Sequence, residues 1–246
     1  MLVLLKNITH LILFCIVYCS DNLANEILLK AIEKHDGINC NFDLTVVKKQ
    51  KAKPDKIKQY DINIFHPKND SLHRMIRIDT IKPLNLSDVS YWEHDYGEGG
   101  LVKRWFTLPL TGKLKEVKGD DKPSGDFNLN DIMIDLNNVL NKSNVVIQTS
   151  SDISTIEIGG KVKQHISIEM DTYRILEVEI FNKYNRVVKE IKFTKYFNLD
   201  NFSIPQLIEI NDKKKKVNFI VTLEGFKKRN DFSKTFFSPR DKYDSN

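Results

Sequence analysis

Hydrophobic and polar residues alternate along much of the chain from Phe42 onward. A period of two is typical of β-strands that have one dry face and one wet face. The alternation is clearest at Phe42–Val46, Asp61–Ile64, Leu72–Asp79, Ile166–Met170, Leu176–Ile180, Ile191–Thr194 and Val217–Leu223. Turn signals such as Gly159-Gly160 and Asn211-Asp212 separate these stretches. The pattern predicts about ten strands in one antiparallel, strongly curled sheet, and therefore a mainly β (α+β) protein.

Two segments have helical spacing instead. From Asn22 to His35, apolar residues recur on one face of a predicted helix, and Gly37 ends it. A second helix is predicted from Asn128 to Leu140, because Asn128 is a good N-cap. Its apolar stripe consists of Leu129, Ile132, Met133, Leu136, Val139 and Leu140. We therefore expect both helices to pack on the dry face of the sheet.

The dry face of so many strands is long, and only two helices are available to cover it. Two helices can plug the mouth of a half-closed barrel, but they cannot fill a wide one. The pattern leaves two solutions: a cavity for an apolar ligand, or a second sheet packed as a sandwich. A sheet wrapped around an apolar cavity with a helical lid favours a lipid carrier.

The N-terminus has the features of a secretory signal peptide. Lys6 and His10 precede the apolar run Leu11–Tyr18, and Ser20 and Ala24 are small residues suited to cleavage. The run is shorter than the roughly 20 residues that span a bilayer. We therefore expect residues 1–20 to be a signal peptide, residues 21–246 to be a single domain, and the protein to be soluble in the periplasm.

A second interpretation concerns Cys19. The stretch Ile16–Cys19 half resembles a lipobox, although a lipobox has a small residue before the cysteine and Tyr18 is large. Lipidation of Cys19 would make the protein an outer-membrane lipoprotein. An uncleaved membrane anchor is the third option for this segment.

Composition narrows the function classes only slightly. The chain has 246 residues, a formal net charge of +5 and a sequence pI of about 8.9, with lysines spread along its length. This charge is typical of a solubilising surface, and the alternative is a preference for anionic lipid. Lys213–Lys216 leaves the same choice open between a solvated turn and a headgroup contact. We expect no nucleic acid partner, because no RNP-like, zinc or helix-turn-helix pattern accompanies the charge.

Cysteine usage excludes a disulfide framework. The three cysteines are Cys15, Cys19 and Cys40, and only Cys40 lies in the predicted domain. A single cysteine without a motif around it is typical of a small buried hydrophobic residue. We therefore expect the domain to be stabilised by its core alone.

The best candidate for chemistry is the stretch Trp92–Glu98. As a strand, it would place Glu93 and Asp95 on one face and His94 on the other. A metal site would also need ligands such as His66 and His73 from a neighbouring hairpin. We favour a polar loop beside an aromatic strand, and expect neither metal nor cofactor. Because no G-x-S-x-G is present, we expect no enzyme, and a hydrolase with a dispersed site is the remote alternative.

Several motifs occur in an order that resembles one known family. The most specific pair is RWFTLPLTGKLKEVKG at Arg104–Gly119 followed by SGDFNLNDI at Ser124–Ile132. Weaker matches are Tyr173–Leu176 with Val178–Phe181, Asn185–Lys189, Ile204-Pro205 and Phe236–Pro239. Together they cover Asn22 to Arg240 and resemble the outer-membrane lipoprotein-sorting proteins of the LolA-like family.

The resemblance implies an incomplete antiparallel β-barrel with a helical lid over an apolar cavity. Such a protein would bind acyl chains of lipoproteins, or phospholipid, and take part in outer-membrane lipoprotein sorting as a periplasmic chaperone. We expect a monomer that meets membrane-associated donor and acceptor proteins. The predicted ligand-contacting residues are Trp92, Trp105, Phe106, Leu108, Ile132, Leu136, Leu140, Ile166 and Ile168. The alternative is a non-catalytic envelope-assembly or interaction protein with a filled core.

Overall fold

The computed structural model describes residues 22–34, 37–68, 72–87, 89–97, 101–117, 140, 144–160, 162–199 and 201–240. The predicted signal peptide at residues 1–20, the Gly125–Phe127 motif and most of the predicted second helix lie outside the described residues. Within that helix only Leu140 is described, and it is helical and packs against the core.

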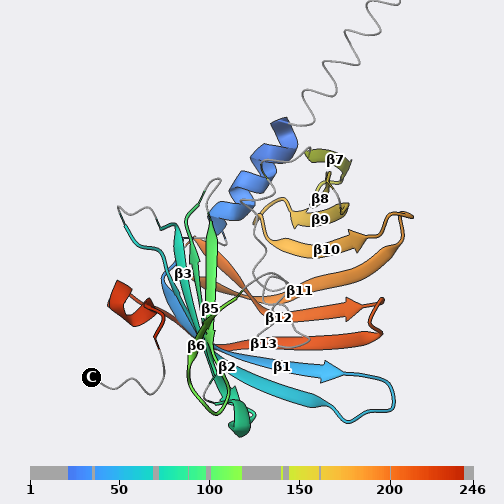
Figure 1. The fold of residues 1–246 in the computed structure, drawn as a ribbon. Coiled ribbons are helices and arrows are strands. Elements are labelled where there is room, and N and C mark those ends of the chain that lie inside the picture. Colours follow the sequence, from blue (N-terminus) through green and yellow to red (C-terminus); the bar gives the residue numbers. More distant parts are fainter. Residues whose placement is uncertain are drawn as a thin grey trace, which may run out of the picture.

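A single antiparallel sheet contains all thirteen strands of the described chain (Figure 1). Their order across the sheet is β6-β5-β4-β3-β2-β1-β13-β12-β11-β10-β9-β8-β7, so β6 and β7 are the two edges and the sheet is not closed. The strands are β1 (Cys40–Lys49), β2 (Lys56–Phe65), β3 (Arg74–Lys82), β4 (Ser90–Asp95), β5 (Val102–Thr107), β6 (Leu114–Glu116), β7 (Asn144–Thr149), β8 (Ile153–Ile158), β9 (Gln164–Glu169), β10 (Ile175–Phe181), β11 (Val187–Leu199), β12 (Phe202–Asp212) and β13 (Val217–Lys228).

One face of the sheet, called the inner face here, carries the main hydrophobic core. On β1, Phe42, Leu44 and Val46 are buried on this face, as the alternating pattern predicts. Leu44 lies opposite Leu223 of β13, and Phe42 lies opposite Ile62 of β2. Figure 1 shows β3–β5 standing upright beside the crosswise strands β10–β13, so the sheet curls around its inner face. The mainly β prediction is confirmed.

The stretches of clearest alternation correspond to seven of the described strands: β1, β2, β3, β9, β10, β11 and β13. No alternating stretch marked β7, β8 or β12. In particular, Ile204-Pro205, one of the motifs that resemble the LolA-like family, lies inside β12, where Pro205 pairs with Tyr196 of β11. Pairing of β12 with β13 begins only at Leu207, so the nitrogen of Pro205 faces no second strand. A proline is tolerated in such an unpaired part of a strand.

A helix formed by residues 22–34 packs on the inner face, as predicted. Its buried residues Ala24, Ile27, Leu28 and Ala31 belong to the same core as the strands. Two polar contacts fix its position: Asn144 of β7 donates a hydrogen bond to Asn25 at 2.9 Å, and Lys30 donates one to the Tyr173 hydroxyl at 3.3 Å. The helix therefore covers the part of the inner face nearest the β7 edge. In the part of the chain that the structure describes, no helix is long and apolar enough to cross a membrane.

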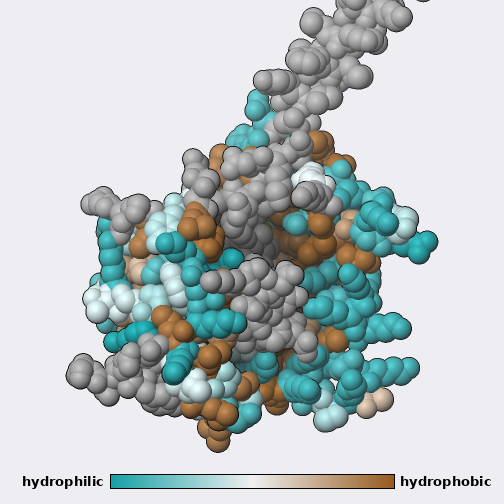
Figure 2. Space-filling model, viewed as in Figure 1, coloured by the Kyte–Doolittle hydropathy of each residue, from teal (hydrophilic) through white to brown (hydrophobic). Residues whose placement is uncertain are grey.

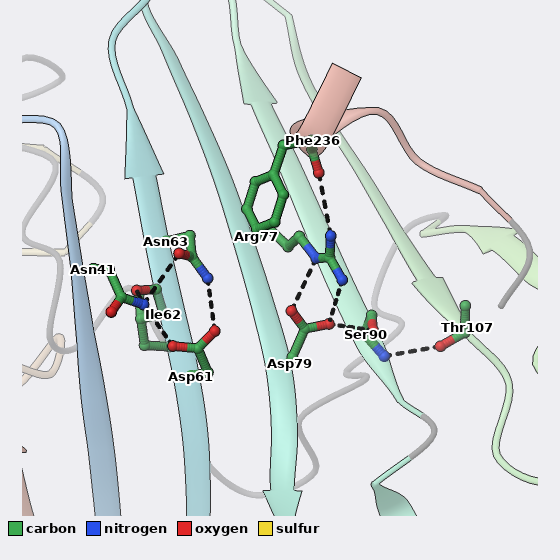
Figure 3. A network of polar contacts seen from close by, with 9 residues as sticks. All are labelled: Asn41, Asp61, Ile62, Asn63, Arg77, Asp79, Ser90, Thr107 and Phe236. Atoms are coloured by element: carbon green, nitrogen blue, oxygen red, sulfur yellow. Dashed lines mark hydrogen bonds and ion pairs between the residues drawn. The ribbon is translucent and has the colours of Figure 1, made fainter. Parts of the chain in front are cut away.

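The opposite, outer face of β2–β5 is covered by the C-terminal segment. The short 3-10 helix η3 (Lys234–Phe237) buries Phe237 completely, and its ring stacks on Phe65 with centroids 5.5 Å apart. Figure 3 shows the polar network beneath it, in which Arg77 donates to the Phe236 carbonyl and pairs with Asp79. The outer face of the sheet is therefore covered where this segment packs on it, and β4 has buried residues on both of its faces.

Candidate ligand-binding face

The inner face of β7–β13 is lined mainly by aliphatic side chains. Along β8–β10 they include Ile156, Ile158, Ile166 and Val178, all buried. Ile180 is on the same face of β10 but only half-buried. Figure 2 shows a hollow lined by hydrophobic residues in this region of the molecule, below the helix. The apolar surface of the candidate site is therefore provided by the crosswise half of the sheet.

Three aromatic rings continue this surface at the end of the sheet where β1 begins. Phe226 stacks between Phe42 and Phe197, with a centroid distance of 6.2 Å to each. A shift in register between β1 and β13 next to Gly225 brings Phe226 onto the inner face. Gly225 has a φ of +63°, which an L side chain rarely adopts, so the irregularity requires a glycine.

A charged cluster lies on the inner face of β3–β5. Glu93 accepts a hydrogen bond from Arg104 Nε at 2.7 Å and another from the Tyr91 hydroxyl at 3.1 Å. Arg74 Nη2 lies 3.5 Å from Glu93 and 3.5 Å from Asp95. The cluster is balanced in charge, with two cations and two anions. The inner face is therefore apolar on the crosswise strands and bears a charged cluster on β3–β5.

Burial and charge set the proton affinities in this cluster. Burial raises the pKa of Tyr91 well above its usual value, and the neighbouring Glu93 charge raises it further. Burial by itself would lower the pKa of Arg104, but the charge and hydrogen bond of Glu93 raise it overall. Tyr91 is therefore a neutral hydrogen-bond donor and Arg104 a permanent cation at neutral pH.

Two of the predicted ligand contacts lie on the other side of the sheet. Trp92 is buried on the outer face of β4, opposite Trp105 of β5, and the Arg77 guanidinium lies 6.0 Å from its ring centroid. Trp105 packs edge-on against His94, which is hydrogen-bonded through Nε2 to the Phe237 carbonyl at 2.9 Å. Both tryptophans thus belong to the layer under the C-terminal segment. The placement differs from our prediction because that segment gives β4 and β5 a second buried face.

The remaining predicted contacts are distributed over three places. Phe106 lies on the inner face, where Lys115 stacks over its ring, while Leu108 lies in the turn between β5 and β6. Ile166 and Ile168 lie on the inner face but are fully buried. Leu140 packs against the same core. Ile132 and Leu136 lie outside the described residues, so their contacts stay predictions.

The candidates for metal binding or catalysis are dispersed. Ser90–Asp95 form strand β4, so the polar loop that we favoured for Trp92–Glu98 is wrong over Trp92–Asp95. Glu93 and Asp95 face inward and His94 outward, as the alternative of a strand predicted. His66 and His73 approach each other, with ring centroids 5.8 Å apart, but His94 is engaged elsewhere. Among the described residues, no group of three or more His, Cys, Asp or Glu side chains could hold a metal ion. Cys40 is free and buried, as predicted, and burial raises the pKa of its thiol to about 12.

Sequence reasoning missed two parts of this face. The aromatic row was missed because Phe226 and Phe197 reach the inner face only through tertiary packing. The charged cluster was detectable in part, since Tyr91, Glu93 and Asp95 recur with a period of two. The partners Arg74 and Arg104 follow only from the registers of β3 and β5 with β4.

No protein-family model matches the sequence, and no curated protein matches it significantly. Solved structures do match. A DUF1329 family protein from Desulfovibrio piger superposes with a TM-score of 0.77 at 13% identity, covering 89% of this chain and 97% of that one. A domain assigned as an outer membrane lipoprotein-sorting protein, from Vibrio parahaemolyticus, gives 0.75 at 14% identity, with coverage of 88% and 97%.

A LolA superfamily protein from Nitrosomonas europaea superposes with a TM-score of 0.64 at 14% identity, covering 88% of this chain and 97% of that one. At such low identities the likeness concerns the fold. The chain therefore has the fold of the LolA-like lipoprotein-sorting proteins, as its sequence motifs predicted.

Proposed function

We propose that this protein is a non-catalytic carrier of the bacterial envelope that binds acyl chains of lipoproteins or phospholipids on the inner face of its sheet. The observation that carries the proposal is the aliphatic and aromatic inner face of a sheet that is not closed. Acyl chains leaving water for such a surface gain about 0.8 kcal/mol per CH2 group. The LolA-like fold supports the same function.

The helix of residues 22–34 is the element that we propose as a lid. In this conformation Ile166 and Ile168 are fully buried in one core with Leu28 of the helix. An acyl chain reaching these isoleucines would take the place of helix side chains. Movement of the helix would then couple uptake and release of the cargo to exposure of the inner face.

The charged cluster supports an amphipathic cargo rather than a purely apolar one. Glu93 and Arg104 lie on the same face as the isoleucines but on the upright strands. An acyl chain on the crosswise strands would extend its polar end toward them. The predicted periplasmic location, and donor and acceptor proteins at the two membranes, remain parts of the proposal.

Substitution of Ile180 by Glu tests the binding face. Ile180 is half-buried on the inner face, so Ile180→Glu would place a carboxylate against the acyl chain, where an unpaired charge is costly. We expect binding of a fluorescent fatty acid to fall at least about tenfold, with the protein still folded. The matched control is Ile220→Glu, which adds the same charge at a half-buried position on the outer face of β13.

Fatty-acid titration and thermal melting of both variants separate the alternatives. Loss of binding in both variants, or in neither, would contradict the assignment of the inner face. If organic extracts of the purified protein contain no lipid and the wild type binds no fatty acid, the filled-core interaction protein becomes the better interpretation. Ester hydrolysis abolished by one Ser or His substitution would favour the hydrolase.

A further inference from the structure

Three turns between neighbouring strands lie side by side at one end of the sheet. They connect β1 to β2, β12 to β13 and β10 to β11, and these six strands are consecutive in the order β2-β1-β13-β12-β11-β10. Figure 1 shows the three turns together at the right-hand tips of the crosswise strands. At about 4.8 Å per strand, the row of turns extends over about 24 Å.

These turns concentrate the positive charge of the chain. Their exposed cations, called the basic rim here, are Lys49, Lys51, Lys53, Lys56, Lys183, Arg186, Lys213, Lys214, Lys215 and Lys216. Only Asp55 and Asp212 lie in the same turns, so cations outnumber acids by ten to two. The formal net charge of the whole chain is only +5, so the remainder of the chain is net acidic. The charge distribution is therefore strongly asymmetric.

Few of these cations are neutralised within the protein. Lys213 pairs with Glu190, and Lys215 lies 3.7 Å from Asp212. Among the residues that the structure describes, the ammonium groups of Lys51, Lys53, Lys214 and Lys216 have no acidic partner. Their charges are available to an external anionic surface.

Exposed apolar side chains accompany the lysines. Tyr184 is 70% exposed at the β10–β11 turn, with the Lys183 ammonium 5.0 Å from its ring centroid, and Ile57 is 53% exposed at the start of β2. Tyrosine beside lysine is typical of side chains at the boundary between lipid headgroups and water.

We propose that the basic rim docks the protein on the surface of an anionic phospholipid bilayer. The proposal rests on the carrier function, because such a protein must reach a membrane to load or deliver its cargo. Lysine ammonium groups would contact lipid phosphates, while Tyr184 and Ile57 enter the headgroup layer. Docking of this kind is reversible, since each contact is weak and is screened by salt.

Vesicle co-sedimentation tests the proposal. The probes are vesicles of phosphatidylglycerol with phosphatidylcholine, and vesicles of phosphatidylcholine alone. Each lysine near an anionic surface contributes about a fivefold gain in partitioning. Replacing four unpaired lysines by Gln should therefore weaken binding to the anionic vesicles about a hundredfold or more. The variant carries Lys51→Gln, Lys53→Gln, Lys214→Gln and Lys216→Gln.

The control removes the same charge from other parts of the surface. It carries Lys34→Gln, Lys68→Gln, Lys227→Gln and Lys234→Gln. We expect this variant to bind anionic vesicles within about threefold of the wild type, because the rim is intact and the field of distant charges is screened. We also expect wild-type binding to fall steeply as salt is raised. Equal losses in both variants would show that net charge alone, and not the rim, causes binding.

Other outcomes also bear on the proposal. Equal wild-type binding to both kinds of vesicle would overturn it, as would preferential binding to polyglutamate, which would indicate an acidic protein partner. Fatty-acid binding in solution should be unchanged in the rim variant. If only the docking proposal is wrong, the wild type still binds fatty acid in solution. If the carrier function is wrong, the wild type binds no fatty acid, whatever its binding to vesicles.

Discussion

Strand β4 buries residues on both of its faces, whereas β11–β13 bury mainly the inner one. On β4, Trp92 and His94 are buried outward and Glu93 inward, so the strand shows almost no alternation in burial. On β13, buried Val221 and Leu223 alternate with more exposed residues. The outer side of β4 is covered by Phe237, which is distant in the sequence. A period-two pattern therefore identifies the core face only where nothing else packs on the sheet.

This difference in burial separates residues that stabilise the fold from residues that would bind the cargo. The aromatic layer under the C-terminal segment is packed and closed, so its residues should affect folding alone. The inner face carries the proposed cargo site, so substitutions there should affect binding as well. Three further experiments test this division.

The largest effect is expected from Phe237→Ala on the outer face. Phe237 is fully buried, and its ring contacts Phe65, Phe232 and Phe236. Its truncation should lower the free energy of unfolding by about 3–5 kcal/mol. Chemical denaturation measures this change. Fatty-acid binding by the protein that remains folded should equal that of the wild type, and a selective loss of binding would contradict the division.

A smaller effect is expected from Glu93→Ala on the inner face of the upright strands. The substitution leaves Arg104 and Arg74 without their shared carboxylate, and Arg104 is partly exposed to solvent. Because water partly solvates Arg104, the free energy of unfolding should fall by about 2 kcal/mol, which is less than the full cost of an unpaired buried charge. Urea denaturation provides the value. Glu93→Gln is the control, because it keeps the hydrogen bonding but removes the charge. If Glu93→Ala leaves the free energy of unfolding unchanged, the charged cluster does not contribute to stability.

The smallest effect concerns the start of the C-terminal segment. The hydrogen bond from Arg229 lowers the pKa of Asp231 to about 2, and the two guanidinium–carboxylate distances are 2.8 and 2.7 Å. Because the folded pKa lies below the unfolded one, the stabilisation is present above about pH 4 and is lost as the pH falls toward 2. Both groups are exposed, so the change in stability should be slight. NMR titration of the Asp231 carboxyl in the wild type should give a midpoint clearly below 3.9, whereas a midpoint at that usual value would contradict the ion pair.

The sequence alone was sufficient to predict the class of fold and to identify which residues of most strands lie on the inner face. Leu44, Val46 and Ile62 alternate with polar residues, and burial of one sheet face requires that alternation. The helix of residues 22–34 followed from its 3.6-residue apolar spacing for the same reason. The family resemblance rested on short motifs in a fixed order, and the fold agrees with it.

Only the tertiary structure decided on which face of the sheet Trp92 and Trp105 lie, because β4 has buried residues on both of its faces. It also decided the row formed by Phe42, Phe226 and Phe197, since stacking depends on a shift in register next to Gly225. The basic rim depends on strand order in the same way. Turns far apart in the sequence become neighbours only when β1 pairs with β13, and a one-dimensional pattern contains no information on that pairing.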